Sequence, residues 1–93
     1  MHFVIYCKDK PGQPELRPAT RPAHVEYLGG FKDKILIAGP MLGDDGNPNG
    51  SLIVIDAADR AAADEFAKND PYAKAGVFAS VAITAWRKAI PKD

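Results

Sequence analysis

One histidine and two arginines lie close together in the segment 17–28, which reads RPATRPAHVEYL. His24 is the strongest candidate for chemistry, because an imidazole both accepts and donates protons near neutral pH. Arg17 and Arg21 could bind a carboxylate or enolate oxygen of a substrate, helped by the free N–H groups of a helix start. Each also has an ordinary interpretation: His24 as a hydrogen-bonded core histidine, and the arginines as surface residues of a loop.

The histidine is expected early on a helix. Thr20 can cap a helix start through its hydroxyl, and Pro22 suits a first turn, where a backbone N–H has no partner within the helix. The helix is expected to end near 31–33, although Gly29 and Gly30 weaken its last part. Helical spacing places four residues on one face: His24, Tyr27, Leu28 and Phe31. Because that face is largely apolar, it is expected to be buried, with the imidazole pointing inward.

The rest of the chain alternates strands with a second helix. Strand patterns cover four ranges: 2–8, 35–38, 51–56 and 77–86. Asp59 can cap the second helix, which Asn69-Asp70-Pro71 ends, since a residue before proline avoids the helical region. The order strand, helix, strand, strand, helix, strand predicts a single ferredoxin-like α+β domain over residues 1–93, a βαββαβ sandwich with an antiparallel sheet.

Such a sandwich leaves one face of its sheet uncovered. The first and last strands are nevertheless apolar on both faces. A large exposed apolar face in a small protein calls for a partner, and a second copy of the chain is the simplest one. The sequence therefore predicts a homodimer formed through this sheet face.

Asp70 is the second candidate for chemistry. In the expected fold, the end of the second helix and the first helix approach the same edge of the sheet, so the carboxylate could orient His24, fix its tautomer and raise its basicity. Asp70 could equally accept a hydrogen bond from the turn that Pro71 begins, as an aspartate before proline often does. Both interpretations stay open.

Other polar residues suggest no cofactor or metal. Ser51 could contribute a polar contact to a cavity, but no G-x-S-x-G elbow surrounds it. The loop carboxylates Asp44 and Asp45 lack the ligand spacing of a calcium site, and His2 has no metal-ligand spacing with His24. No phosphate-binding loop, dinucleotide fingerprint or zinc motif is found, so we expect a protein without cofactor or metal.

Composition narrows the partners and the location. Twelve Lys and Arg residues balance twelve Asp and Glu residues, which gives no basic surplus for nucleic acid. The apolar run 3–7 is too short for a membrane span or a signal peptide. The single cysteine, Cys7, cannot form an internal disulfide and is expected to be a buried strand residue. These features predict a soluble, cytoplasmic protein whose partners are a small-molecule substrate and a second copy.

Five short motifs occur in a fixed order: Arg21-Pro22-Ala23-His24-x-x-Tyr27-Leu28, Ala38-Gly39-Pro40, Gly50-Ser51, Asn69-Asp70-Pro71-Tyr72 and Trp86. Together they resemble the YciI-like proteins (YCII-related domain) of the dimeric α/β-barrel superfamily, and the resemblance spans nearly the whole chain. It implies a ferredoxin-like fold, a dimer with sheets face to face, and a cavity that holds a histidine and aspartate pair at His24 and Asp70. Gly39, Pro40 and Ser51 would then lie near the cavity wall.

The resemblance also implies a class of activity. Most members of the family have no established substrate, but one type is a dehydrochlorinase of a chlorinated hydroxyhydroquinone, and muconolactone isomerases share the superfamily. We therefore expect a small cofactor-independent lyase or isomerase that uses His24 and Asp70 for acid/base chemistry on an oxygenated small molecule, for example a chlorinated aromatic one. The alternative is a non-catalytic dimeric module that binds a small ligand or serves another enzyme.

Overall fold

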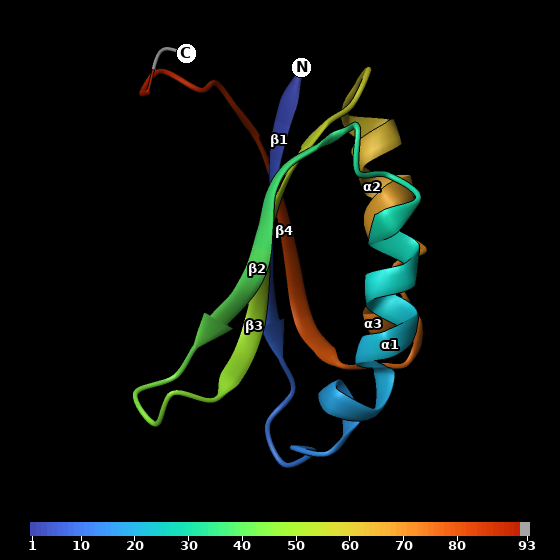
Figure 1. The fold of residues 1–93 in the computed structure, drawn as a ribbon, viewed down its shortest axis with the longest axis vertical. Helices are drawn as coiled ribbons and strands as arrows, with labels where there is room; N and C mark the ends of the chain where they lie inside the picture. The colour runs from blue at the N-terminus through green and yellow to red at the C-terminus, as the bar shows by residue number, and fades with distance from the viewer. Residues whose placement is uncertain (92–93) are drawn as a thin grey trace.

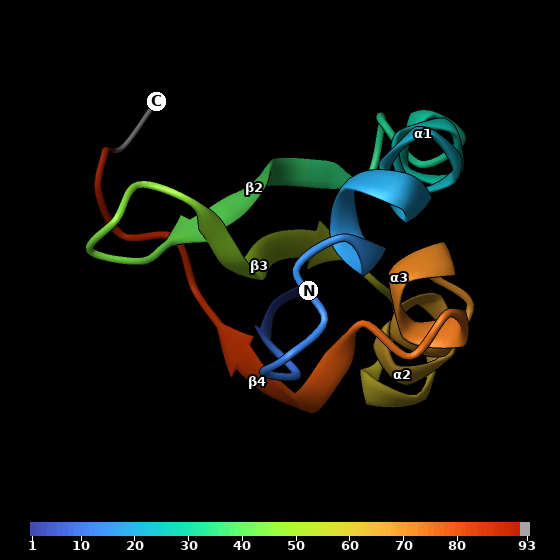
Figure 2. The ribbon, with the colours of Figure 1, turned by 90° about the horizontal axis from the view of Figure 1, so that it is seen from below.

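The computed structural model describes residues 1–91. Its elements in chain order are β1 (His2–Asp9), α1 (Leu16–Gly29), β2 (Ile35–Leu42), β3 (Pro48–Asp56), α2 (Arg60–Lys68), α3 (Pro71–Lys74) and β4 (Phe78–Trp86). The four strands form one sheet in the order β2-β3-β1-β4, and every neighbouring pair is antiparallel. The helices lie together on one side of this sheet (Figures 1 and 2). The predicted ferredoxin-like α+β fold is confirmed.

The core follows the alternation of β1. Phe3, Ile5 and Cys7 face the helices and are almost fully buried, because successive side chains of a strand point to opposite faces. In the register with β3, Phe3 lies opposite Ile55 and Ile5 opposite Ile53. The α2 residues that cover this row are Ala63, Phe66 and Ala67.

The apolar row ends in polar residues at one end of the sheet. Cys7 lies opposite Ser51 of β3, which is also buried, and Asp9 is the next β1 residue on the helix side. The first turns of α1 cover this end, as Figure 1 shows at the bottom of the view. Polar side chains from β1, β3 and α1 are thereby brought together.

The opposite face of the sheet is covered by none of the described helices (Figure 2). The register places Tyr6, Ile37, Met41 and Trp86 on it, and all four are exposed. We call this surface the open sheet face. The homodimer through it stays a prediction.

The predicted start of the first helix is wrong. α1 begins at Leu16, with Glu15 as its N-cap residue and no side-chain cap. Thr20 lies inside the helix, where its hydroxyl donates to the Leu16 carbonyl at 2.9 Å, and Pro22 also lies in the interior. Pro22 removes only one hydrogen bond of the helix and its φ is already helical, so the packing of the apolar face can override it.

Other element boundaries also differ from the predicted ones. α1 ends at Gly29, before the predicted end at 31–33. β2 continues through Gly39 and Pro40, four residues beyond the predicted strand. Proline is tolerated there because β2 is an edge strand, where a missing N–H leaves no partner strand unsatisfied. His24 is buried on the inner face of α1, as the spacing predicted.

Candidate active site

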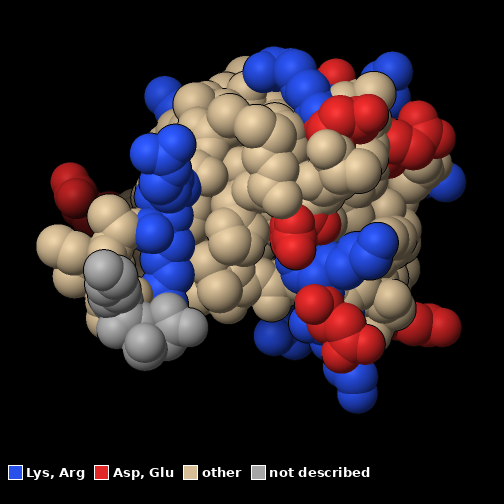
Figure 3. All heavy atoms as spheres, turned by 90° about the horizontal axis from the view of Figure 1, so that it is seen from above, with Lys and Arg blue, Asp and Glu red and all other residues tan. Residues whose placement is uncertain are grey.

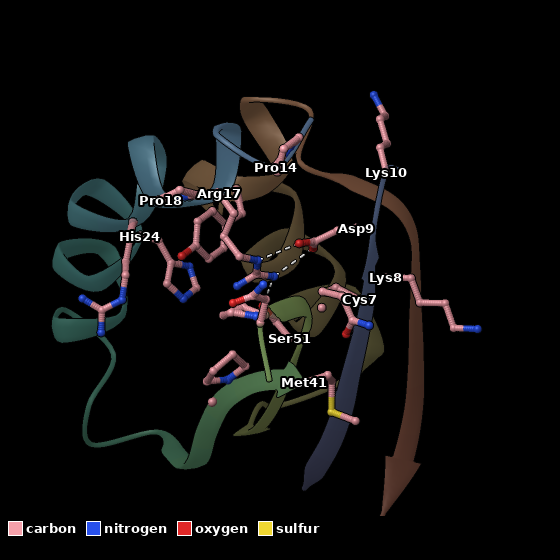
Figure 4. Close-up of a pocket in the computed structure, with 18 of the residues that line it drawn as sticks. Cys7, Lys8, Asp9, Lys10, Pro14, Arg17, Pro18, His24, Met41 and Ser51 are labelled. Atoms are coloured by element: carbon pink, nitrogen blue, oxygen red, sulfur yellow. Dashed lines mark hydrogen bonds and ion pairs between the residues drawn. The ribbon is translucent and has the colours of Figure 1, made fainter. Parts of the chain in front are cut away.

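A cavity of about 1370 Å³ opens at the polar end of the sheet. Its wall includes every residue that the sequence singled out for substrate contact, namely Arg17, Arg21, Gly39, Pro40 and Ser51, together with His24. Figure 4 shows Arg17 and His24 reaching into this space from α1, with Ser51 facing them from the sheet. The sequence therefore identified residues that the fold gathers around one cavity.

His24 and Asp70 form a buried pair. The Nδ1 atom of His24 lies 2.8 Å from Oδ1 of Asp70, and the carboxylate side chain is only 3% exposed. The same Oδ1 accepts the backbone N–H of Tyr72 at 3.0 Å and so caps α3. Asp70 thus makes both of the contacts that were considered for it, because one oxygen offers two lone pairs; its role in orienting a base stays a prediction.

The second nitrogen of His24 is available for chemistry. In the neutral ring, a carboxylate at Nδ1 favours the tautomer with its proton there, which leaves the lone pair on Nε2. No buried side-chain nitrogen or oxygen in residues 1–91 lacks a hydrogen-bond partner, and the ring makes its only hydrogen bond through Nδ1. Nε2 therefore keeps some accessible surface, and His24 is one of the residues that line the cavity. This is the geometry of an oriented general base.

Tyr72 supports the imidazole from its side. The two rings are stacked, with centroids 4.0 Å apart and planes at 19°. The guanidinium carbon of Arg17 lies 4.5 Å from the centroid of the same tyrosine ring. Burial raises the pKa of Tyr72, although the charge of Arg17 opposes the shift, so the phenol stays neutral at physiological pH. Tyr72 thus contacts both the imidazole of His24 and the guanidinium of Arg17.

Arg17 is held by three hydrogen bonds. Its Nε and Nη2 atoms donate to the two carboxylate oxygens of Asp9, at 2.7 and 2.9 Å, and Nη2 also donates to Oγ of Ser51 at 2.8 Å. Burial lowers the pKa of Arg17, but the hydrogen bonds and charge of Asp9 more than offset this, so the pKa lies above its usual value. The interpretation of Arg17 as a surface loop residue is wrong.

Sequence reasoning missed Asp9. The signal that could have found it is the alternation of β1, because Asp9 continues the row of Phe3, Ile5 and Cys7 toward the helices. Arg21, one helical turn beyond Arg17, lines the cavity and is exposed, and it makes no hydrogen bond or ion pair within residues 1–91. Cys7 also lines the cavity, but burial raises its pKa to about 12, which makes it a poor nucleophile at neutral pH.

Among the described residues there is neither a cluster of metal ligands nor a membrane-spanning helix. No three His, Cys, Asp or Glu side chains of the described residues are arranged to hold a metal ion. Within the same part of the chain, no helix has the length and apolar character needed to cross a membrane.

Comparison with known proteins shows the family. The family model of the YCII-related domain matches residues 1–87. The chain belongs to the YCII-related domain family. YciI of Escherichia coli is 35% identical over 96 aligned positions, which cover 95% of this chain and 98% of that protein. A protein of Haemophilus influenzae is 34% identical with the same coverage. The family predicted from the five motifs is confirmed.

Two solved structures of other proteins have a similar fold. This YCII-related chain superposes with a TM-score of 0.91 and 37% identity, over the full length of both chains, on 5-chloro-2-hydroxyhydroquinone dehydrochlorinase (TftG) from Burkholderia phenoliruptrix, solved in complex with 2,5-dihydroxybenzoquinone. A putative antibiotic biosynthesis monooxygenase from Bacteroides thetaiotaomicron is 15% identical, with a TM-score of 0.59 over 99% of this chain and 91% of that one. The second likeness shows the fold alone.

Proposed function

We propose that this protein is a small enzyme that moves protons on a hydroxylated ring, and that its reaction is the elimination of HCl from a chlorinated hydroxyhydroquinone. The observation that carries the proposal is the buried pair of His24 and Asp70, 2.8 Å apart, at a histidine that lines the cavity. The dehydrochlorinase with a TM-score of 0.91 supports the choice of substrate. A cytoplasmic location, in keeping with the unpaired thiol of Cys7, is part of the proposal.

The reaction balances without a cofactor. Nε2 of His24 removes the proton of the hydroxyl beside the chlorinated carbon and returns it to that carbon, which leaves a ketone. Nε2 then removes the proton of the hydroxyl para to the new ketone. The electrons of this O–H bond form a second C=O, a ring double bond shifts toward the chlorinated carbon, and chloride departs. The products are a hydroxybenzoquinone and HCl, so no external oxidant is needed.

Each polar residue has a role in this sequence. Asp70 holds the imidazole in the productive tautomer and stabilises the imidazolium that forms, and base catalysis of this kind contributes about 10²–10⁴-fold. Arg17 hydrogen-bonds the ring oxygen on which negative charge develops, and Ser51 adds a polar contact beside it. Removing one such donor costs about 10²–10³-fold in kcat in other enzymes. Arg21 attracts the anionic form of the ring from the cavity mouth.

The test is chloride release from 5-chloro-2-hydroxyhydroquinone, with quinone formation followed by absorbance. His24→Asn should lower kcat by about 10²–10⁴-fold, because the amide cannot take up the proton. His2→Asn is the matched control, since His2 lies outside the cavity wall and its ring packs near Trp86 at 6.2 Å between centroids. The proposal fails if His24→Asn turns the substrate over like the wild type. Binding of the quinone without any chloride release would instead identify a ligand-binding module.

A further inference from the structure

We propose that Asp9 is a positioning residue: it fixes Arg17 as a directional donor to an anionic oxygen of the ligand and so makes the cavity selective for ring anions. The inference rests on the proposed function for the identity of the site, and it adds a residue and a ligand charge that the acid/base pair does not require.

The position of Asp9 is determined by its strand. The alternation of β1 turns this side chain toward α1, and its carboxylate is 15% exposed beside a guanidinium that is 10% exposed. Both carboxylate oxygens are used, one by Nε and one by Nη2 of Arg17. A bidentate contact of this kind fixes the plane of the guanidinium as well as its place.

An irregularity of the sheet supports the same contact. In the pairing of β1 with β4, Lys8 lies opposite Ser80 but Asp9 lies opposite Phe78, so β4 carries one extra residue at this point. Such a bulge changes the face to which the following side chains point. Phe78 thereby packs edge-on against Tyr72, at 5.8 Å between centroids, and its ring lies 6.0 Å from the guanidinium carbon of Arg17.

The contacts leave one part of Arg17 for a ligand. A guanidinium has five N–H donors on three nitrogens, and the contacts with Asp9 and Ser51 use only Nε and Nη2. Nη1, with two donors, is needed for neither contact, and Arg17 lines the cavity. Asp9 and Ser51 hold Nε and Nη2, and Tyr72, which also interacts with this side chain, has its ring centroid 4.5 Å from the guanidinium carbon, so Nη1 is the nitrogen that the contacts with Asp9 and Ser51 leave for a ligand.

The charges around the cavity indicate an anionic ligand. Its wall carries four basic residues, Lys8, Lys10, Arg17 and Arg21, and one carboxylate, Asp9, in a chain whose formal charge is zero. At the end of the molecule away from the cavity, acidic and basic groups adjoin on one side of an uncharged area, and a row of basic groups lies on the other (Figure 3). Because Asp9 balances the charge of Arg17, Arg17 supplies direction, while Arg21 supplies the net attraction together with Lys8 and Lys10, whose side chains point away from Arg17 and His24 at the margin of the cavity (Figure 4).

The experiment measures binding, so that it does not depend on turnover. Calorimetry on the full-length protein compares 2,5-dihydroxybenzoquinone, a vinylogous acid that is ionised at neutral pH, with hydroquinone, which is neutral. The wild type should prefer the anion. Asp9→Asn removes a negative charge, which by itself would favour the anion, so a fall in the ratio of the two affinities reports the lost direction of Arg17. We expect the ratio to fall about tenfold, the scale on which loss of a supporting hydrogen bond acts at metal sites. Asp33→Asn, an exposed site outside the cavity wall, is the matched control and should leave the ratio unchanged.

Three outcomes would overturn the inference: a wild type without preference for the anion, an Asp9→Asn variant with the wild-type ratio, or equal weakening of both ligands, which is the mark of a purely structural role. Ser51→Ala removes a separate tether of Arg17 and should shift the ratio in the same direction by a smaller factor. If Asp9→Asn does not fold, the Ser51→Ala variant provides the test, because an unchanged ratio of the two affinities in Ser51→Ala also contradicts the inference. A protein that keeps the preference but releases no chloride would refute the proposed function alone.

Discussion

The buried carboxylate of Asp70 makes two contacts, one with a side chain and one with the backbone. Its Oδ1 atom contacts Nδ1 of His24 and accepts from the Tyr72 backbone, so the residue that holds the imidazole also starts α3. The ring of Tyr72 also stacks on the imidazole, so each of these three residues contacts the other two. The proposed base is therefore positioned by the same contacts that stabilise the local fold, and under the proposed function substitutions at Asp70 should lower stability together with turnover.

Ionisation of Cys7 should make the free energy of unfolding depend on pH. Burial, with a further contribution from Asp70, raises its pKa to about 12 in the folded protein, whereas a free thiol ionises near pH 8.5. Below that pH both states hold the proton and stability is unaffected. Above it the unfolded state binds fewer protons, so the free energy of unfolding should fall as pH rises toward 12.

Urea unfolding between pH 8 and 9.5 checks this expectation, because tyrosines ionise only near pH 10. Cys7→Ala should flatten the slope of stability against pH, whatever its effect on absolute stability. Equal slopes in the wild type and the variant would show that Cys7 does not carry the effect.

The residues of the site were predictable to different degrees. His24 and Asp70 could be paired from sequence because the order of elements fixes which helix ends meet at a sheet edge. The partner of Arg17 could not be found in this way, since Asp9 lies across a loop of irregular backbone, and only the side-chain direction at the end of β1 brings the two together. The start of α1 was misjudged because local capping preferences at Thr20 and Pro22 are weaker than the packing of the whole helix face.

At the scale of elements, the contact of β1 with β3 holds the site together. Gly50 lies opposite Lys8, and a Cβ atom built at Gly50 would collide with the carbonyl oxygen of Cys7. A glycine is therefore required for the two strands to approach at this point. The next residue is Ser51, so the close approach also sets the distance from Ser51 to Arg17.

Gly50→Ala should consequently destabilise the protein by about 1–3 kcal/mol, the usual cost of inserting an atom into a packed region. Gly29→Ala is the matched control, because nothing lies within 4 Å of a Cβ atom at that position. Alanine in place of the last α1 residue should raise stability, by up to about 1 kcal/mol. Urea unfolding of both variants gives the two values, and a fully stable Gly50→Ala variant would show that the strands can separate without cost.

At the scale of the molecule, the open sheet face is the feature that a lone chain leaves unexplained. Its exposed apolar residues come from three of the four strands, and Ile37 alone is 55% exposed. Soluble proteins rarely keep such a surface in water. We propose that a second copy covers it, as the apolar pattern of the strands predicts.

Light scattering coupled to gel filtration tests the dimer. Ile37→Glu should yield a folded monomer, because the charge is tolerated on an exposed site but costs several kcal/mol when buried without a partner. Ala61→Glu, on the exposed side of α2, should remain dimeric. A wild-type protein that is monomeric at micromolar concentration would contradict the proposal.

The most direct test of the central claim, that the His24 imidazole moves the proton, is chemical rescue. His24→Ala removes the ring and leaves space that joins a cavity of about 1370 Å³, so free imidazole can reach the same place. Chloride release from 5-chloro-2-hydroxyhydroquinone should be nearly lost in His24→Ala and should rise with added imidazole, while the wild type does not respond. Wild-type rates of chloride release from His24→Ala without imidazole would contradict the account.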